Sequence, residues 1–200
     1  MSVNQHGSNR EFAGLALPPP AQGLYDPKNE HDACGVGFVA DLRARPSHTI
    51  VQYGLQILEN LTHRGAVGAD PLAGDGAGML VQMPHEFLKV VTAPLRIALP
   101  EPGHYAAGHM FMPRNEAQRI YCQSVVERAT EAEGLQLLGW RDVPTDNSCL
   151  GQSVIETEPR HMQVFIGRWR DVKDESSFER KLYVLRKVIS ITICGDTGGR

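Results

Sequence analysis

The sequence lacks long apolar runs and basic clusters. No uninterrupted apolar stretch approaches the roughly 20 residues of a membrane-spanning helix, and the first 20 residues lack the cationic and apolar regions of a secretory signal. The 200-residue chain has a formal net charge of −3 and no Lys/Arg run with interleaved aromatic residues. These absences argue against a membrane partner and a nucleic-acid partner. We expect a cytoplasmic protein.

The sequence also lacks the cysteine and histidine spacings of common metal and redox sites. Its four cysteines are widely separated and form no C-x-x-C pair, which disfavours a zinc ribbon, a thioredoxin-like site and a disulfide framework. The eight histidines include no H-E-x-x-H motif, so no metal site is predicted. Each cysteine therefore has to be interpreted alone.

The chain reads as a polar leader followed by one layered domain. Residues 1 to about 32 are rich in proline and polar residues and show no sustained period, which is typical of a segment outside the core. Apolar periodicity after this leader predicts helices over 49–60, 84–91, 115–133 and 176–188, and strands over 35–42, 79–83, 106–112, 135–140 and 161–167. The spacings of Asn115 to Gln118 and of Ser176 to Glu179 fit capping boxes, so Asn115 and Ser176 are expected to cap the last two helices. The tail that starts at Val188 begins like a further strand. Interleaved strands and helices indicate an α+β or α/β domain.

One cysteine lies at an unusual junction, in the stretch NEHDACGVGF of residues 29–38. Free cysteine is among the most buried residue types, so Cys34 is either a small core residue at a strand start or a nucleophile. If the chain were cut before Cys34, its new α-amino group would have a pKa of about 7.7–8.0 and could act as a general base. The thiol and its base would then belong to one residue.

A glycine-rich segment follows the first predicted helix, over residues 61–78. Its five glycines and one proline predict a long ordered loop, and long ordered loops often carry function. The spacing G-x-G-x-G of Gly74, Gly76 and Gly78 does not match a nucleotide-binding loop, because no strand directly precedes it and no G-K-[ST] follows. On residue chemistry alone, Arg64 and Asp75 are a structural ion pair that holds the loop.

Four segments together resemble the amino-terminal glutaminase domain of the glutamate synthase large subunit. They are YDPKNEHDACGVGFVADL, LENLTHRGAVGADPLAGDGAGMLVQMPHEF, LPEPGHYAAGHMFMPR and LGWRDVPTDNSCLG, and the similarity extends from about Tyr25 to about Lys187. The resemblance implies a class II glutamine amidotransferase with an N-terminal-nucleophile (Ntn) hydrolase fold, a four-layer α-β-β-α sandwich. It divides the chain into a leader over 1–33 and a partial amidotransferase domain over 34–200.

The resemblance also implies a chemistry for three residues. Removal of residues 1–33 would expose Cys34, which would attack the side-chain amide of L-glutamine, form a γ-glutamyl thioester and release ammonia for glutamate synthesis from 2-oxoglutarate. Arg64 would lie beside the thiol, where a fixed cation favours the thiolate. Asp75 would organise Arg64 or its loop.

The match is incomplete at the C-terminal end. The Asn-Gly pair that forms the family's oxyanion hole and its carboxylate-binding arginine come later in the domain, and the sequence contains no Asn-Gly dipeptide. Loss of one oxyanion-hole donor costs about a hundred- to a thousand-fold in rate. Two alternatives therefore stay open, which are a truncated, non-catalytic remnant that associates with partner chains and an Ntn amidohydrolase for another amide.

The implied partners and cofactors lie mostly outside this segment. The expected ligand is L-glutamine, and the expected partners are the remaining large-subunit domains and the small subunit of glutamate synthase. By resemblance, FMN and an iron-sulfur cluster belong to the full enzyme, and no cofactor is expected in residues 34–200.

Overall fold

The computed structural model describes residues 20–23, 26, 35–62, 72–73, 76–169 and 171–197. These residues belong to two compact units. The first unit contains residues 20–23, 26, 35–62 and 76–78, and the second contains residues 72–73, 79–169 and 171–197. The described residues form a mixed α+β structure, as the sequence predicts.

The second unit is built on an antiparallel sheet. Among the described residues the sheet has the strands β1 (Tyr105–Met112), β2 (Gln136–Asp142) and β3 (Arg160–Gly167), in the order β1-β3-β2. Gly167 lies opposite both Tyr105 and Gln136, so the last strand in sequence is the central one. The three predicted strands over 106–112, 135–140 and 161–167 are confirmed within two residues.

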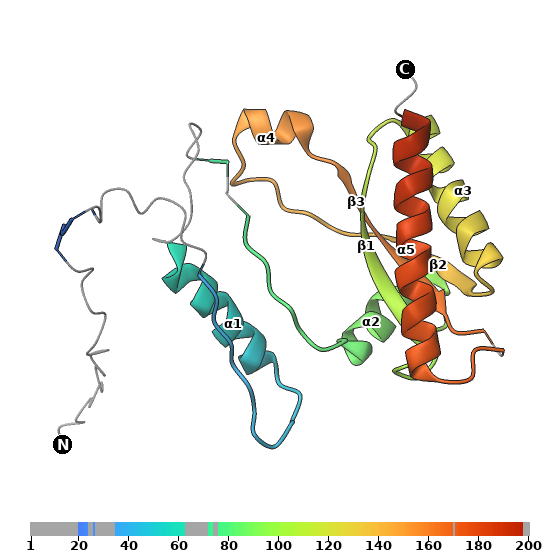
Figure 1. Ribbon diagram of the computed structural model, residues 1–200, viewed down its shortest axis with the longest axis horizontal. Coiled ribbons are helices and arrows are strands. Elements are labelled where there is room, and N and C mark those ends of the chain that lie inside the picture. The colour runs from blue at the N-terminus through green and yellow to red at the C-terminus, as the bar shows by residue number, and fades with distance from the viewer. Residues whose placement is uncertain are drawn as a thin grey trace. The chain divides into compact units, whose positions relative to one another are not determined.

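Two helices cover one face of this sheet. The helices α3 (Glu116–Ala132) and α5 (Glu175–Thr197) lie side by side against it (Figure 1). Because side chains alternate along a strand, Val164 and Ile166 of β3 point into this layer. The layer is closed by an apolar core of Val126, Ala129, Leu135, Val164, Ile166, Val172, Phe178 and Leu185.

Within the described part of the second unit, one end of the opposite face of the sheet is covered. There α2 (His85–Thr92) and the 3₁₀ turn η3 (Ala93–Leu95) pack on the sheet, and Phe165 is fully buried with Leu88, Ile97 and Tyr105. Burial, with a smaller contribution from Glu86, raises the pKa of Tyr105. Further along the same face of β1, the Phe111 side chain is 70% exposed.

The first unit joins an extended segment to a helix. The helix α1 (His48–Asn60) begins after Ser47, whose hydroxyl oxygen accepts the Thr49 N–H as an N-cap. Residues 35–40 run close along this helix. A Cβ at Gly35 would collide with Leu61, and a Cβ at Gly37 would collide with Ile57. Glycine is therefore what permits the close approach.

Several expectations from the sequence are wrong. Residues 35–42 and 79–83 are not strands, because neither segment has a ladder partner among the described residues. The tail continues α5 to Thr197 instead of forming a strand, since Ile189 and Ile193 extend the buried stripe of Leu185 at helical spacing.

Two local features of the second unit also differ from expectation. The short helix α4 (Gln152–Thr157) lies where the sequence predicts no helix. The helix α5 starts one residue earlier than expected, and the carboxylate of Asp174 accepts the Ser177 N–H at 2.7 Å in the manner of an N-cap. The Asn115 cap of α3 is confirmed, because its Oδ1 accepts the Gln118 N–H at 3.1 Å.

The packing of residues 35–40 on α1 makes a testable prediction. A Cβ at Gly37 would lie 2.5 Å from Cγ2 of Ile57, so Gly37→Ala forces the two segments apart. We expect it to lower the free energy of unfolding by about 1–3 kcal/mol, the usual cost of overpacking. Urea unfolding followed by circular dichroism measures this change.

Two variants control that experiment. Gly78→Ala should be close to neutral, because a Cβ added there would meet no atom within 4 Å apart from its chain neighbours. The pair Gly37→Ala and Ile57→Ala should be non-additive, since removal of Cγ2 leaves room for the new methyl group. Equal effects at Gly37 and Gly78 would contradict the close approach.

Candidate functional site

The three site residues expected from the sequence, Cys34, Arg64 and Asp75, lie outside the described residues. The residues that flank them are described. A Cβ at Gly35 would lie 2.8 Å from Cδ2 of Leu61, so the residue after Cys34 packs on the residue that ends α1. Gly76 follows Asp75 and belongs to the same compact unit.

A tight turn holds this arrangement in place. The Asp41 carboxylate accepts the Arg43 N–H at 2.6 Å and pairs with the Arg45 guanidinium at 2.9 Å. The side-chain bond from Arg45 and the backbone bond from Arg43 lower the pKa of Asp41. Ala44 adopts a left-handed conformation with φ 52°. The chain reverses here, so residues 35–40 return along α1.

The described thiols differ in exposure. Cys122 is buried in a cluster with Met112 and Met162, and this burial raises its pKa. Cys149 and Cys194 are exposed, and they lie in the second unit. Because the thiolate is the reactive form, Cys122 is expected to be inert.

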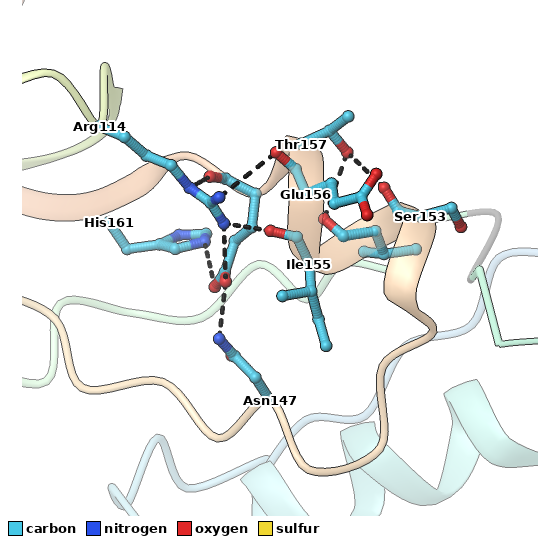
Figure 2. A network of polar contacts seen from close by, with 9 residues as sticks. Arg114, Asn147, Ser153, Ile155, Glu156, Thr157 and His161 are labelled. Atoms are coloured by element: carbon cyan, nitrogen blue, oxygen red, sulfur yellow. Dashed lines mark hydrogen bonds and ion pairs between the residues drawn. The ribbon is translucent and has the colours of Figure 1, made fainter.

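A polar network around Glu158 is a feature that the sequence did not predict. Arg114 donates from Nε to the Glu158 carbonyl at 2.6 Å and from Nη1 to the Glu156 carbonyl at 3.3 Å, and Nη2 donates to the Ile155 carbonyl (Figure 2). These carbonyls lie at the C-terminal end of α4, where a cation is favoured. Arg114 therefore anchors α4.

The Glu158 carboxylate, which is 14% exposed, receives side chains from three other segments. Asn147 donates to Oε2 at 2.6 Å, and Nη2 of Arg114 lies 3.8 Å from the same oxygen. Nε2 of His161 lies 3.7 Å from Oε1 (Figure 2). The Glu158 carboxylate thus links the loop before α4, through Asn147, to the sheet, through His161.

The strand register explains why these residues meet. Met112 lies opposite Arg160 in the antiparallel ladder of β1 and β3. Arg114 and Glu158, two residues beyond each end, continue that register although they are 44 residues apart in sequence. No local spacing relates them, so sequence reasoning had no signal for this contact.

A groove of about 460 Å³ opens beside this network. Its lining combines apolar residues of the β1–α3 connection with polar residues around Glu158, namely Phe111, Met112, Pro113, Arg114, Asn115, Gln118, Glu156, Thr157, Glu158 and Pro159. Arg114 directs its donors to carbonyl groups of the chain itself. The Arg114 guanidinium at the edge of the groove therefore has a structural role.

The searched parts of the chain offer neither a metal cage nor a membrane span. Within the described ranges, no three His, Cys, Asp or Glu side chains gather in a way that could bind a metal ion. Among the helices in those ranges, none has the length and apolar character needed to cross a bilayer.

Comparison with known proteins gives a consistent result. The family model described as glutamine amidotransferases class-II matches residues 34–198. The glutamate synthase (NADPH) large chain of Bacillus subtilis (strain 168) is 46% identical over 169 residues, which are 84% of this chain and 11% of that protein. The glutamate synthase (NADH) of Saccharomyces cerevisiae (strain ATCC 204508 / S288c) is 41% identical over 199 residues, which are 95% of this chain and 9% of that protein.

A plant relative has a similar extent. The ferredoxin-dependent glutamate synthase 1, chloroplastic/mitochondrial, of Arabidopsis thaliana is 37% identical over 186 residues, which are 92% of this chain and 11% of that protein. The chain therefore spans about a tenth of the length of these curated relatives.

Proposed function

Because the chain belongs to the class-II glutamine amidotransferases, we propose that it carries the nucleophile part of a glutamate synthase glutaminase domain. The observation that carries this proposal is the contact between Gly35 and Leu61. Cys34 precedes Gly35 directly, and chain length alone keeps Arg64 within about 11 Å of Leu61. Gly76, which follows Asp75, belongs to the same unit as Gly35 and Leu61.

The proposed reaction starts after removal of residues 1–33 by hydrolysis of the bond between Ala33 and Cys34. The α-amine of Cys34 takes the thiol proton, and Sγ attacks the side-chain amide carbon of L-glutamine. The C–N bond then breaks, and the nitrogen leaves as ammonia with the proton from the α-amine. Water next adds to the thioester and gives its proton to the amine, and cleavage of the C–S bond releases glutamate and regenerates the thiol.

The roles of the loop residues follow from charge. The Arg64 guanidinium is permanently charged, and beside Sγ it would favour the thiolate. Asp75 would hold that guanidinium in place, since a carboxylate matches its planar donors. Arg64 and Asp75 are therefore positioning residues in this proposal.

We infer from the family that the complete domain has an Ntn hydrolase fold, a four-layer α-β-β-α sandwich. In the first unit, glycines face α1 while Val36 and Phe38 are 91% and 93% exposed. In the second unit, α3 and α5 cover one face of the sheet, while Phe111 stands exposed on the other. The sheet of the second unit thus has a helix layer on one side and an exposed apolar side chain on the other, the pattern of an inner sheet in a sandwich.

The rest of the proposed enzyme lies outside the 200 residues of this sequence. The relatives are about ten times longer than this segment, and we assign the flavin and iron-sulfur chemistry and the small-subunit contacts to that remainder. The ammonia released at Cys34 would serve glutamate synthesis from 2-oxoglutarate there. We place the bacterial-type enzyme in the cytoplasm.

Intact mass spectrometry with a glutamine-analogue diazo-ketone tests the proposal. The purified chain is incubated with the electrophile, and the adduct is mapped by peptide analysis. We expect a polypeptide that lacks residues 1–33 and carries one adduct on Cys34, since a diazo-ketone alkylates the activated thiolate. Excess L-glutamine should protect the site.

Matched variants distinguish the proposed glutaminase from the two alternative hypotheses. Cys34→Ser should carry no adduct, whereas Cys149→Ser, which removes an exposed thiol of the second unit, should be labelled normally. An unprocessed and unlabelled chain would support the remnant reading, in which exposed apolar residues such as Phe38 and Leu80 serve association. Protection by another amide but not by glutamine would favour a different Ntn amidohydrolase.

A further inference from the structure

Three titratable side chains form a line across the network described above. Nε2 of His161 faces Oε1 of Glu158 at 3.7 Å, and Nδ1 of His161 lies 3.1 Å from Nε2 of His109. His109 is on β1 and His161 on β3, at diagonal positions of the antiparallel ladder, so both rings stand on the same sheet face. The line therefore connects the end of α4 to β1.

The short distance between the two rings limits how many protons they can hold. A hydrogen bond between two imidazole nitrogens needs one N–H and one bare nitrogen, because a protonated ring has only donors. A pair with one positive charge satisfies this need and also places an N–H of His161 toward Glu158. A pair with two positive charges places two N–H groups face to face.

The surroundings leave Glu158 as the nearest anion of the pair. Arg114 and Asn147 use Oε2 of Glu158, so Oε1 faces His161. On the same face, Arg141 of β2 donates to the Gln163 side chain at 2.8 Å. The Phe111 ring contacts both imidazoles at centroid distances of 5.1 and 5.4 Å and brings no charge.

We propose that His109, His161 and Glu158 form a proton-sensitive clasp. The clasp is closed when one proton is shared between Nε2 of His109 and Nδ1 of His161, and it opens when a second positive charge on the pair separates the rings. Closed, the clasp ties β1 through β3 to the segment that follows α4. Opened, it places two like charges beside Phe111 and releases the His109 side chain from the sheet surface. Binding of the second proton by His109 and His161 thereby adds positive charge to the sheet face that carries Phe111.

The direction of the effect on stability follows from His109. Burial, and then the neighbouring His161, lower the pKa of His109 below its ordinary value. The unfolded chain therefore binds a proton at this residue before the folded chain does. Stability is retained above a pH of about 6.5 and declines as the pH falls through the lowered pKa.

Proton NMR of the histidine rings in the whole 200-residue chain tests the clasp. Resonances of both rings are followed between pH 4.5 and 8.5. We expect each ring to sense two steps, with the second proton bound at least about tenfold more weakly than the first, as for interacting sites. Two independent single-step curves would overturn the proposal.

Three variants assign the steps. In His161→Gln, His109 should titrate in one step with a higher pKa than in the parent chain, but still below the ordinary value because burial remains. Glu158→Gln should alter the His109 curve less than His161→Gln does, since Glu158 faces His161 and not His109. His104→Gln, which removes an exposed imidazole before β1, should leave both curves unchanged. An unaltered His109 curve in His161→Gln would also refute the coupling.

Discussion

Replacement of Cys34 by alanine is expected to reduce glutamine hydrolysis by a factor on the order of 10³ to 10⁶ in a polypeptide that contains the complete glutaminase domain. The physical reason is that Sγ forms the thioester, and neither the α-amine nor a bound water can replace it as a nucleophile of equal strength. Glutamate released from L-glutamine, measured by a coupled assay, reports the loss.

A matched cysteine variant separates chemistry from folding. Cys149→Ala removes an exposed thiol that lies in the second unit, whereas residues next to Cys34 lie in the first. It should retain full activity. Thermal unfolding of both variants should match the parent protein. Full hydrolysis by Cys34→Ala, or by Cys34→Ser, would refute the assignment of the nucleophile.

The second large effect is expected at Phe165, which lies on the central strand β3 and is 0% exposed. Its ring packs with Leu88, Ile97 and Tyr105 on the face that α2 covers. Phe165→Ala should lower the free energy of unfolding by about 3–5 kcal/mol, because it removes the buried ring and leaves a cavity. Urea unfolding measures the change.

Another phenylalanine on the same sheet face provides the control. Phe111 of β1 is 70% exposed, so Phe111→Ala should change the free energy of unfolding by no more than about 0.5 kcal/mol. Phe165→Leu should fall between these values. Equal losses at Phe165 and Phe111 would show that the α2 layer does not protect Phe165 in solution.

Local sequence signals predicted most of the helices. The Asn115 cap and the apolar spacing after it place α3 within two residues of its observed bounds, and α1 and α2 are equally close. Helical hydrogen bonds join residues four apart, so the information for these elements is contained in short stretches. Cap chemistry at the start of α5 was misassigned to Ser176, because Asp174 is an equally good capping residue two positions earlier.

The errors share a different physical origin. Residues 35–42 and 79–83 have strand-like composition, yet a strand exists only where a second segment completes its hydrogen bonds. The tail is rich in Ile, Val and Thr, but Ile189 and Ile193 pack at helical spacing on the core below α5. Tertiary packing outweighed β-propensity in that segment.

The residues of interest for function also fall into two groups, those predicted from sequence motifs and those brought together only by the tertiary structure. The assignment of Cys34, Arg64 and Asp75 rests on motifs in the printed sequence and stays a prediction, while the family is established by the match over residues 34–198. The Glu158 network had no such motif. Its members come together because β1 and β3 pair in one register, which places Arg114 opposite Glu158.

Helices α1, α2 and α3, the Asn115 cap, the α+β class and the resemblance to the family could be predicted from the sequence, because each depends on residues close together in the chain or on motifs in it. Tertiary structure alone decided the strand order β1-β3-β2, the extension of α5 and the line from Glu158 to His109. These features depend on contacts between distant residues. Their free energy is gained only when the ladder and the core close together.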